Sequence, residues 1–394
     1  MYRPAFELAG ILREHAPAYR ESHRLLREQE RAIDAIVNCR TAAMGGHVEE
    51  CCQCAYTRIS YNSCRNRNCP KCQTTARAKW VQDRQEELLP VEYFHVVFTL
   101  PEQIARIAYY NRKEVYNILF RATAQTLTTI AGDPQHLGAE IGFFAILHTW
   151  GQNLLHHPHL HCVVPGGGLS PDGEGWMSCK PGFFLPVKVL SRLFRRLFLE
   201  MMEAAFGKGE LRFFGELSEL HDPDRFAFYL APLHNIEWVV YAKPPFGGPR
   251  QVLDYLGRYT HRVALSNERL LDVKDGQVTF QWKDYRSKGR QKSRTMTLES
   301  DEFIRRFLIH VLPRGFQRIR FFGLLSNRRR KEALTTCRRL LTAPITDLLP
   351  NPDDYRAVRQ PLTEESIRRC PCCGKGEMVR VLTVAPAWPS PDSS

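Results

Sequence analysis

The sequence predicts an α+β fold with a mainly antiparallel sheet, because helical and strand-like stretches alternate and at least one strand pair is closed by a tight turn. Of its 394 residues, 43% are hydrophobic and 25% are charged, which suits a globular chain rather than a disordered one. The Asp275-Gly276 pair, between Leu271 and Trp282, is typical of a two-residue hairpin. Residues 39–72 differ in composition, since they are rich in Cys, Asn, Arg and Gly. We therefore expect a small cysteine-rich region ahead of a larger mixed domain.

Helices and strands are expected in mixed order along the chain. Apolar residues recur at helical spacing among Arg and Glu over roughly the first forty residues, which predicts an N-terminal helical region. Aromatic and β-branched runs predict strands at residues 91–100, 141–149, 159–164 and 236–243. Amphipathic stretches predict further helices at residues 76–89, 112–130, 185–205 and 251–260. The tail from about Pro344 is rich in Pro, Ser and Asp, and we expect it to be loosely held except around residues 370–374.

The net charge of +13 is concentrated in one stretch of the chain. Residues 283–339 hold 17 Lys or Arg against 5 Asp or Glu. A localised basic stretch suits a polyanion, because each cation that neutralises a phosphate releases a counterion. A solvated basic surface is the alternative, and we favour nucleic acid over it.

Several classes of protein are excluded by the sequence pattern. The longest apolar runs are too short to cross a bilayer, and the Met1-Tyr2-Arg3-Pro4 start lacks the apolar segment of a secretory signal. We therefore expect no membrane partner and a cytoplasmic location, where the 13 cysteines stay as thiols or metal thiolates. Nothing resembles a phosphate-binding Gly-Lys-Ser/Thr loop, so no ATP is expected.

Two Cys-x2-Cys pairs predict a structural Zn²⁺ site, because this spacing lets one turn present two thiolates to one ion. The expected ligands are Cys51, Cys54, Cys69 and Cys72. Three nearby residues could supply a second ion or alternative ligands: Cys39, His47 and Cys64. A third pair, Cys370 and Cys373, could form a C-terminal zinc site, for which Cys337 is the obvious upstream thiol. None of these sites is expected to be catalytic, because sites made only of thiolates are closed.

His159-Leu160-His161 lies on a predicted strand and is a candidate metal site. Side chains at positions i and i+2 share a face, so both imidazoles can reach one divalent ion while Leu160 packs into the core. Histidines on strands are more often structural, so this motif alone is weak.

Tyr255 and Tyr259 lie four residues apart on a predicted helix, so both hydroxyls can point to one place. An aromatic core stripe is the ordinary explanation for this spacing. However, Arg250, Arg258 and Arg262 lie around the pair, and such a setting suits a phosphate. A metal ion and arginines could then assist attack of a tyrosine on phosphorus, which gives a covalent phosphotyrosine.

Five stretches of the chain closely resemble the rolling-circle insertion-sequence transposases of the HUH, two-tyrosine type (the IS91 family). They are HTWGQ at 148–152, HPHLHC at 157–162, PGGG at 165–168, YLGRY at 255–259 and the zinc-domain motif YNSCRNRNCPKC at 61–72. The resemblance covers roughly residues 5–340. One departure is Asn68, where the family's pattern has His, and it puts the set of zinc ligands in doubt.

The resemblance implies a nuclease domain with a central antiparallel sheet and flanking helices. It implies a metal-dependent tyrosine endonuclease and strand transferase, with Tyr255 and Tyr259 as nucleophiles and a 5'-phosphotyrosine intermediate. The expected cofactor is Mg²⁺ or Mn²⁺, bound by His159, His161 and, as third ligand, Gln152. His148 and His157 are the alternatives for this third position.

The implied partner is single-stranded DNA at the transposon ends and the target, with a host helicase as a further candidate. The residues expected to bind phosphate are Arg258, Arg262, Arg286, Lys288, Arg290 and Lys292. Four consecutive regions follow: a helical, zinc-binding domain at 1–90, an HUH nuclease domain at 91–265, a basic DNA-binding extension at 266–345 and a loosely ordered tail at 346–394.

Two other functions compete with a transposase. A replication initiator or a conjugative relaxase would use the same chemistry, but the N-terminal cysteines argue against both. A non-enzymatic, zinc-dependent DNA-binding protein would explain the charge and the cysteines. It would leave the tyrosine pair and the His159 and His161 pair unexplained.

Overall fold

The computed structural model describes residues 4–73, 84, 87–243, 263–284, 293–341 and 368–387. The chain forms two compact units, each assembled from separate stretches of sequence. Unit 1 comprises Met1–Trp80, His261–Val311 and Thr346–Ser394, and unit 2 comprises Val81–Thr260 and Leu312–Ile345. This division differs from the four consecutive regions expected, because pairing over long sequence distances divides the basic stretch between the units and returns the tail to unit 1.

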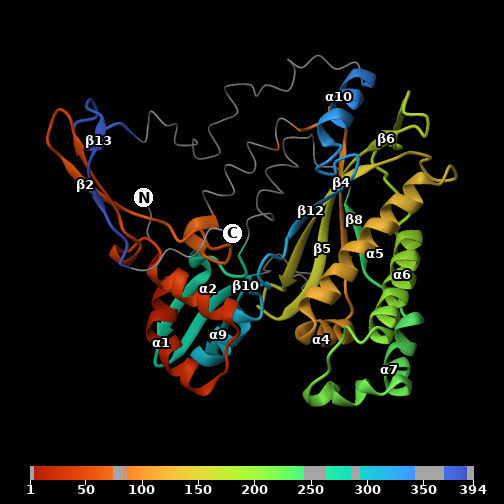
Figure 1. Ribbon diagram of the computed structural model, residues 1–394, viewed down its shortest axis with the longest axis horizontal. Helices are drawn as coiled ribbons and strands as arrows, with labels where there is room; N and C mark the ends of the chain where they lie inside the picture. The colour runs from red at the N-terminus through yellow and green to blue at the C-terminus, as the bar shows by residue number, and fades with distance from the viewer. Residues whose placement is uncertain are drawn as a thin grey trace. The chain divides into compact units, whose positions relative to one another are not determined.

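Unit 2 is built on a five-stranded sheet in the order β12-β4-β5-β3-β8, in which all neighbours are antiparallel (Figure 1). The strands are β3 (Tyr93–Thr99), β4 (Gly142–Trp150), β5 (His156–Pro165), β8 (Val240–Lys243) and β12 (Ile319–Gly323). The antiparallel sheet and four of its strands are confirmed. The sequence reasoning missed β12, a short strand that lies within the basic stretch and pairs with β4.

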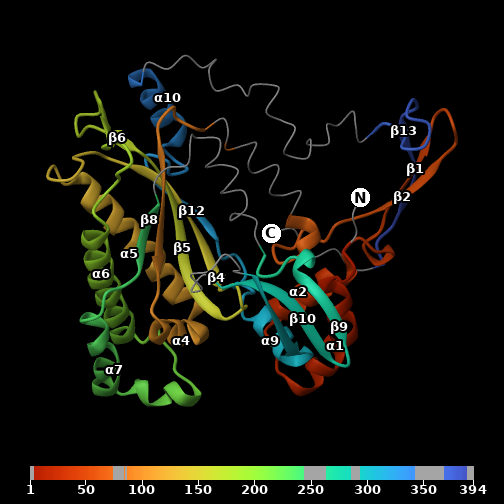
Figure 2. The same cartoon turned by 180° about the vertical axis from the view of Figure 1, so that it is seen from behind.

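Helices cover one face of this sheet (Figure 2). They include α4 (Glu102–Tyr110), α5 (Arg112–Gly132) and α6 (Val187–Gly207). Smaller elements complete unit 2: β6 (Gly167–Leu169), β7 (Trp176–Ser178), α7 (Pro223–Leu230), α10 (Arg330–Leu340) and the 3-10 turns Gly215–His221 and Ala231–His234.

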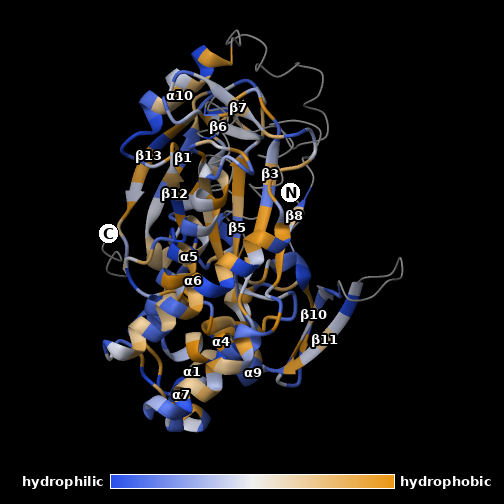
Figure 3. Cartoon of the chain, turned by 90° about the vertical axis from the view of Figure 1, so that its right-hand side faces the viewer, coloured by the Kyte–Doolittle hydropathy of each residue, from blue (hydrophilic) through white to orange (hydrophobic). Residues whose placement is uncertain are grey.

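The core of unit 2 lies between the sheet and these helices. Phe94, Val96 and Phe98 of β3 and Leu160 of β5 belong to this core, and Leu160 is fully buried. Figure 3 shows the hydrophobic residues running along the central strands. Because side chains alternate along a strand, the residues between these positions lie on the opposite face of the sheet. His95, His159 and His161 are on that face.

Unit 1 contains a second α+β assembly. Its helices are α1 (Leu8–Ser22), α2 (Arg27–Asn38) and α9 (Ser300–Leu308). Its sheet has the order β11-β10-β9 and consists of β9 (Leu270–Lys274), β10 (Gln277–Lys283) and β11 (Ser293–Glu299). A 3-10 turn at Asn267–Arg269 precedes β9. The predicted hairpin is confirmed, since Asp275 and Gly276 link β9 and β10 with φ of 51° and 74°. Gln29 joins α2 to α9, because its Nε2 donates to the Leu308 carbonyl at 3.0 Å.

A three-stranded sheet in the order β13-β1-β2 also belongs to unit 1. It consists of β1 (Gly46–Cys51), which follows the 3-10 turn Ala42–Met44, β2 (Thr57–Tyr61) and β13 (Met378–Val384). β13 pairs antiparallel with β1, from Gly46 opposite Val384 to Cys51 opposite Met378. The expectation that the tail would be loosely held outside residues 370–374 is therefore wrong for β13, which gains its partner from the opposite end of the chain.

Among the described residues, no helix has both the length and the apolar character needed to cross a membrane.

Candidate metal centres

The candidate catalytic centre is a group of histidines on the face of the unit 2 sheet opposite the core that packs against α4, α5 and α6. His159 and His161 lie on β5, and His148 lies directly opposite His159 on β4. His95 lies on β3, the other neighbour of β5. A bulge between His148 and Trp150 shifts the register at the end of β4, next to the cluster.

Three of these imidazoles converge on one point. Nε2 of His159 lies 3.1 Å from Nε2 of His161. Candidate ligand atoms of His148, His159 and His161 all lie within 4.8 Å of one another. His148 and His161 are buried, whereas His159 is partly exposed, so the cluster is open on the side of His159. One divalent ion could therefore bind all three imidazole nitrogens.

The second ring nitrogens fix the direction in which two of these imidazoles point. His159 Nδ1 lies 2.7 Å from the carbonyl oxygen of His157, to which it can donate only when it carries the proton. His161 Nδ1 lies 2.7 Å from Nε2 of His95. In both rings this arrangement directs Nε2 towards the shared point. A hydrogen bond at the other ring nitrogen is the usual second contact of a metal-binding histidine.

His95 is suited to accept that hydrogen bond because it stays neutral. Burial lowers its pKa to about 3, and the positive charge of Lys243 adds to this effect. A neutral His95 can offer Nε2 as an acceptor when its proton is on Nδ1. His95 was not singled out from the sequence. Its signal would have been the position of a histidine on the strand that neighbours the His159 and His161 motif.

The structure also bears on the third ligand. It places His148, one of the alternatives, beside the pair, and His148 stacks on Trp150 with ring centroids 4.7 Å apart. Gln152 lies in the turn after β4 and is half-buried. The side chain of His157 is exposed, and its carbonyl oxygen supports His159.

The other predicted site residues of the nuclease lie outside the described residues. They are the nucleophiles Tyr255 and Tyr259 and the phosphate-binding candidates Arg258, Arg262, Arg286, Lys288, Arg290 and Lys292.

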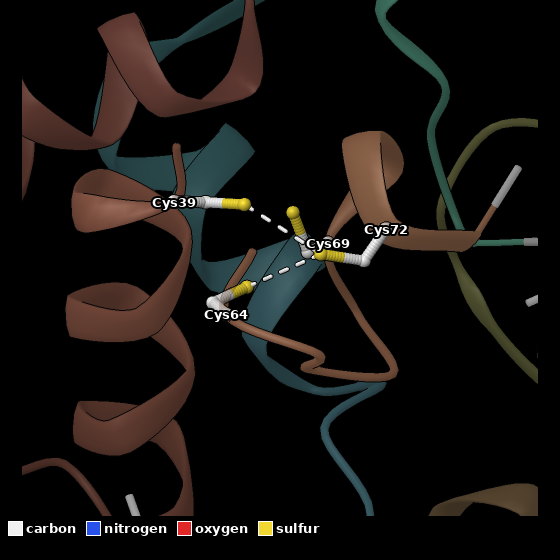
Figure 4. A group of neighbouring side chains, drawn as sticks. All are labelled: Cys39, Cys64, Cys69 and Cys72. Carbon is white, nitrogen blue, oxygen red and sulfur yellow. Dashed lines mark hydrogen bonds between the residues drawn. The ribbon is translucent and has the colours of Figure 1, made fainter. Parts of the chain in front are cut away.

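The first cysteine cluster consists of Cys39, Cys64, Cys69 and Cys72, all buried (Figure 4). Sγ of Cys72 lies 3.5 Å from Sγ of Cys39 and 3.6 Å from Sγ of Cys64. Thiolates held at about 2.3 Å from a tetrahedral zinc ion lie roughly 3.8 Å apart, so the four sulfurs fit Zn²⁺. Hydrogen bonds among the four thiols lower the pKa of Cys39 and Cys72 and raise the pKa of Cys64 and Cys69.

The second cluster consists of Cys51, Cys54, Cys370 and Cys373. Sγ of Cys51 lies 3.7 Å from Sγ of Cys373, and Sγ of Cys54 lies 3.6 Å from Sγ of Cys370. All 13 cysteines of the chain are described, and each is a free thiol.

These clusters correct the expected zinc ligands. Cys51 and Cys54 do not meet Cys69 and Cys72, because the β1–β2 hairpin carries the first pair towards the C-terminal pair. Cys39 and Cys64, which were left open, complete the first cluster. The other two candidates belong to neither cluster: His47 lies 3.5 Å from Glu49, and Cys337 is buried among Leu89, Leu324 and Leu334.

Part of the basic stretch is engaged within unit 2. Arg320 donates to Oδ1 of Asn117 at 2.6 Å, and its guanidinium lies 4.2 Å from the ring centroid of Phe120. Arg329 forms a two-pronged ion pair with Glu140, at 2.5 and 3.2 Å. Both side chains therefore have partners in the fold, but only Arg329 is paired with an opposite charge.

The region of the histidine cluster and the region of the first cysteine cluster each match a known protein family. Residues 142–333 match a family described as putative transposase, and residues 11–100 match one described as transposase zinc-binding domain. The first match spans the three histidines. The second spans the first cysteine cluster, so a structural Zn²⁺ in this region is supported.

Two curated relatives are similar to the chain over most of its length. The putative transposase y4qJ of Sinorhizobium fredii is 61% identical over 384 residues, covering 97% of this chain and 96% of the relative. The transposase for insertion sequence element IS801 of Pseudomonas savastanoi pv. phaseolicola is 27% identical over 309 residues, covering 75% of this chain and 70% of the relative. No solved structure matches the chain.

Proposed function

We propose, since this chain belongs to the IS91 family of transposases, that it cuts and rejoins single-stranded DNA by tyrosine attack beside the His148, His159 and His161 cluster. The observation that carries the proposal is the convergence of these three imidazoles, two of which have their Nδ1 atoms hydrogen-bonded away from the shared point. These contacts direct Nε2 of His159 and Nε2 of His161 towards that point, where the two atoms lie 3.1 Å apart.

The donor set favours one of the two expected ions. Mg²⁺ binds through oxygen and keeps much of its water shell, whereas Mn²⁺ belongs to the first-row ions that also bind nitrogen sites, although with the lowest affinity of that series. His148, His159 and His161 therefore fit Mn²⁺ better than Mg²⁺, and Gln152 is the alternative source of an oxygen ligand. When bound, the ion would polarise a phosphate oxygen and stabilise the negative charge that develops during attack.

Tyr255 and Tyr259 are the proposed nucleophiles. A phenol has a pKa of about 10, so its proton must leave as the oxygen attacks phosphorus. The new bond joins the tyrosine oxygen to phosphorus, and the bond from phosphorus to the 3' oxygen breaks. The 3' oxygen takes up a proton and becomes a free hydroxyl, while the 5' end stays on the protein as phosphotyrosine. Attack by a 3'-hydroxyl reverses these steps, so rejoining needs no ATP.

The proposed substrate is single-stranded DNA at the ends of the element and at its target. The sequence carries no Gly-Lys-Ser/Thr phosphate loop, so strand separation would come from another source, such as a host helicase. Two tyrosines would allow the second to cut while the first is still bound to DNA.

The test is a cleavage assay with labelled single strands from the ends of the element. Purified protein is incubated with Mn²⁺, Mg²⁺ or EDTA and separated on a denaturing protein gel. We expect a covalent protein–DNA band with Mn²⁺, a weaker one with Mg²⁺ and none with EDTA. The band should be lost in the Tyr255→Phe/Tyr259→Phe double variant, and the single variants give the order of use.

A matched histidine control separates the metal centre from the fold. His161→Ala should abolish the band, whereas His136→Ala, at an exposed position of the same unit, should leave it unchanged. Retention of the band by the double tyrosine variant would refute these nucleophiles. A protein with normal zinc content and DNA binding that forms no band on any end sequence would be a DNA-binding protein without this activity.

A further inference from the structure

We propose that Cys51, Cys54, Cys370 and Cys373 bind a second structural zinc ion, which fastens the C-terminal strand to the N-terminal hairpin. The two halves of this site are more than 300 residues apart in sequence, since Cys54 and Cys370 are separated by 316 positions. Both halves belong to unit 1. The site is distinct from the histidine cluster and does not depend on the proposed DNA cleavage.

The sulfur positions suit a metal ion better than a disulfide. Sγ of Cys54 lies 3.6 Å from Sγ of Cys370, Sγ of Cys51 lies 3.7 Å from Sγ of Cys373, and all four sulfurs lie within 4.8 Å of one another. Two disulfides, Cys51 with Cys373 and Cys54 with Cys370, would each need a separation of about 2.05 Å, and they would not require all four sulfurs to converge. Four sulfurs at roughly tetrahedral separations are the usual ligand set of structural zinc.

The backbone holds the two Cys-x2-Cys turns in the same way. The N–H groups of Gln53 and Cys372 each point to the sulfur of the first cysteine of their turn, at 3.4 Å in both cases. The N–H of Ala55 donates to the Cys51 carbonyl, and that of Gly374 donates to the Cys370 carbonyl. Two sequences of different composition have thus adopted one conformation that presents paired sulfurs.

The two turns also share the backbone conformation of the residue that follows their last cysteine. Ala55 has a φ of 53° and Gly374 a φ of 66°, so both lie in the left-handed region. For Ala55 this conformation is strained, and it is retained where surrounding structure requires it. Both turns therefore need a left-handed residue at the same position, which supports one metal ion bound by both turns.

Close packing at Gly376 provides an independent observation. A Cβ at this position would collide with Sγ of Cys51, and the Gly376 N–H points to Sγ of Cys373 at 3.3 Å. Only glycine lets the backbone approach both sulfurs at once. The C-terminal segment is therefore shaped around a compact sulfur cluster.

Among the described residues, only a small buried cluster lies against the β13-β1-β2 sheet. Its buried cluster consists of Cys51, Cys370 and Met378, with Cys373 packed against them. Between the buried Met378 and the half-buried Val384, every residue of β13 is exposed. Small assemblies that cannot bury enough apolar surface often rely on a metal ion instead. The second zinc would supply that stability and keep β13 paired with β1.

The two zinc ions should differ in accessibility. All four sulfurs of the first cluster belong to buried residues, whereas Cys54 is exposed and Cys373 is half-buried. A chelator or a thiol reagent should therefore remove the second zinc before the first.

The test is the zinc content of the full-length protein, measured by atomic emission after dialysis. All variants are made in a His161→Ala background, so that the histidine cluster does not add a zinc ion, and the parent with this one substitution should contain close to two zinc ions per chain. The pair Cys370→Ser/Cys373→Ser should contain one, and so should Cys51→Ser/Cys54→Ser. Combining all four substitutions should also leave one, because both pairs serve the same ion. Cys372→Ser, an exposed cysteine of the same turn, is the matched control and should retain two.

The remaining zinc shows that the variants are still folded around the first cluster. Amide hydrogen exchange then reports on the site itself, and the β13 amides should exchange at least about tenfold faster in the paired variants. Two outcomes would overturn the proposal: one zinc in the His161→Ala parent, or two in the Cys370→Ser/Cys373→Ser variant. The second outcome would show that Cys370 and Cys373 are not ligands of a zinc ion.

Discussion

The candidate ligand residues of the cysteine clusters and of the histidine cluster are positioned in different ways. Three of the first cluster's sulfurs lie in a loop-rich stretch after β2, where the ion would take the place of a core. The histidines instead lie on neighbouring strands whose other face packs against helices, so their positions do not depend on a metal ion.

This difference separates a structural site from a catalytic one. Four thiolates complete a tetrahedron and leave no position for a substrate. Three imidazoles leave positions open, and the partly exposed His159 gives access to them. Substitution of a sulfur ligand should therefore damage the fold, whereas substitution of a histidine should damage the chemistry alone.

The largest effect is expected for Cys69→Ser in the first cluster. Structural zinc contributes on the order of 10 kcal/mol in small zinc domains, which is comparable to the whole stability of a domain. We expect loss of this zinc and unfolding of its surroundings, measured by zinc content and limited proteolysis. The exposed Cys52 provides the control, and Cys52→Ser should behave as the unsubstituted protein. Normal zinc content in Cys69→Ser would remove this residue from the ligand set.

The next effect is expected for His161→Ala, which should slow single-strand cleavage by about a thousandfold, or roughly 4 kcal/mol of activation free energy. Zinc content and the melting temperature should change little. Its neighbour Leu160 is fully buried on the opposite face, so Leu160→Ala should lower the free energy of unfolding by about 2–5 kcal/mol.

Together these adjacent positions test the comparison directly. His161→Ala should lose cleavage and keep stability, whereas Leu160→Ala should lose stability and keep cleavage per folded molecule. The reverse pattern would show that the histidine face is structural.

Local spacing predicted the elements that depend on neighbours in sequence. The alternation of His159, Leu160 and His161 correctly predicted a strand with Leu160 in the core, and Asp275-Gly276 correctly predicted a hairpin. The partners of each motif depend on pairing over long distances. The neighbours His95 and His148 follow from strand register, and the meeting of Cys54 with Cys370 follows from β13 joining β1.

A smaller effect is expected for His95, which we infer to position His161. The partners of a ligating histidine typically change metal affinity by 10–100-fold, or roughly 1.4–2.7 kcal/mol. His95→Phe should raise the Mn²⁺ concentration needed for half-maximal cleavage by this factor, with little change at saturating Mn²⁺. His95→Gln retains an acceptor oxygen and should recover part of the affinity. If both variants lose the same activity at saturating Mn²⁺, His95 acts through packing instead.

The smallest effect is expected for Arg329→Ala, which tests whether the basic stretch serves the fold or DNA. Arg329 and its partner Glu140 are both largely exposed, and such pairs contribute about 0–1 kcal/mol to stability. If Arg329 acts only through its ion pair with Glu140, Arg329→Ala should change the free energy of unfolding by no more than this amount. The salt dependence of DNA binding should then stay the same. A residue that contacts phosphate would instead reduce the slope of log affinity against log salt by about 1. Glu140→Ala distinguishes the two roles, because it removes the acidic partner of Arg329. If DNA binding becomes tighter and more salt-dependent in that variant, the ion pair keeps Arg329 from binding DNA.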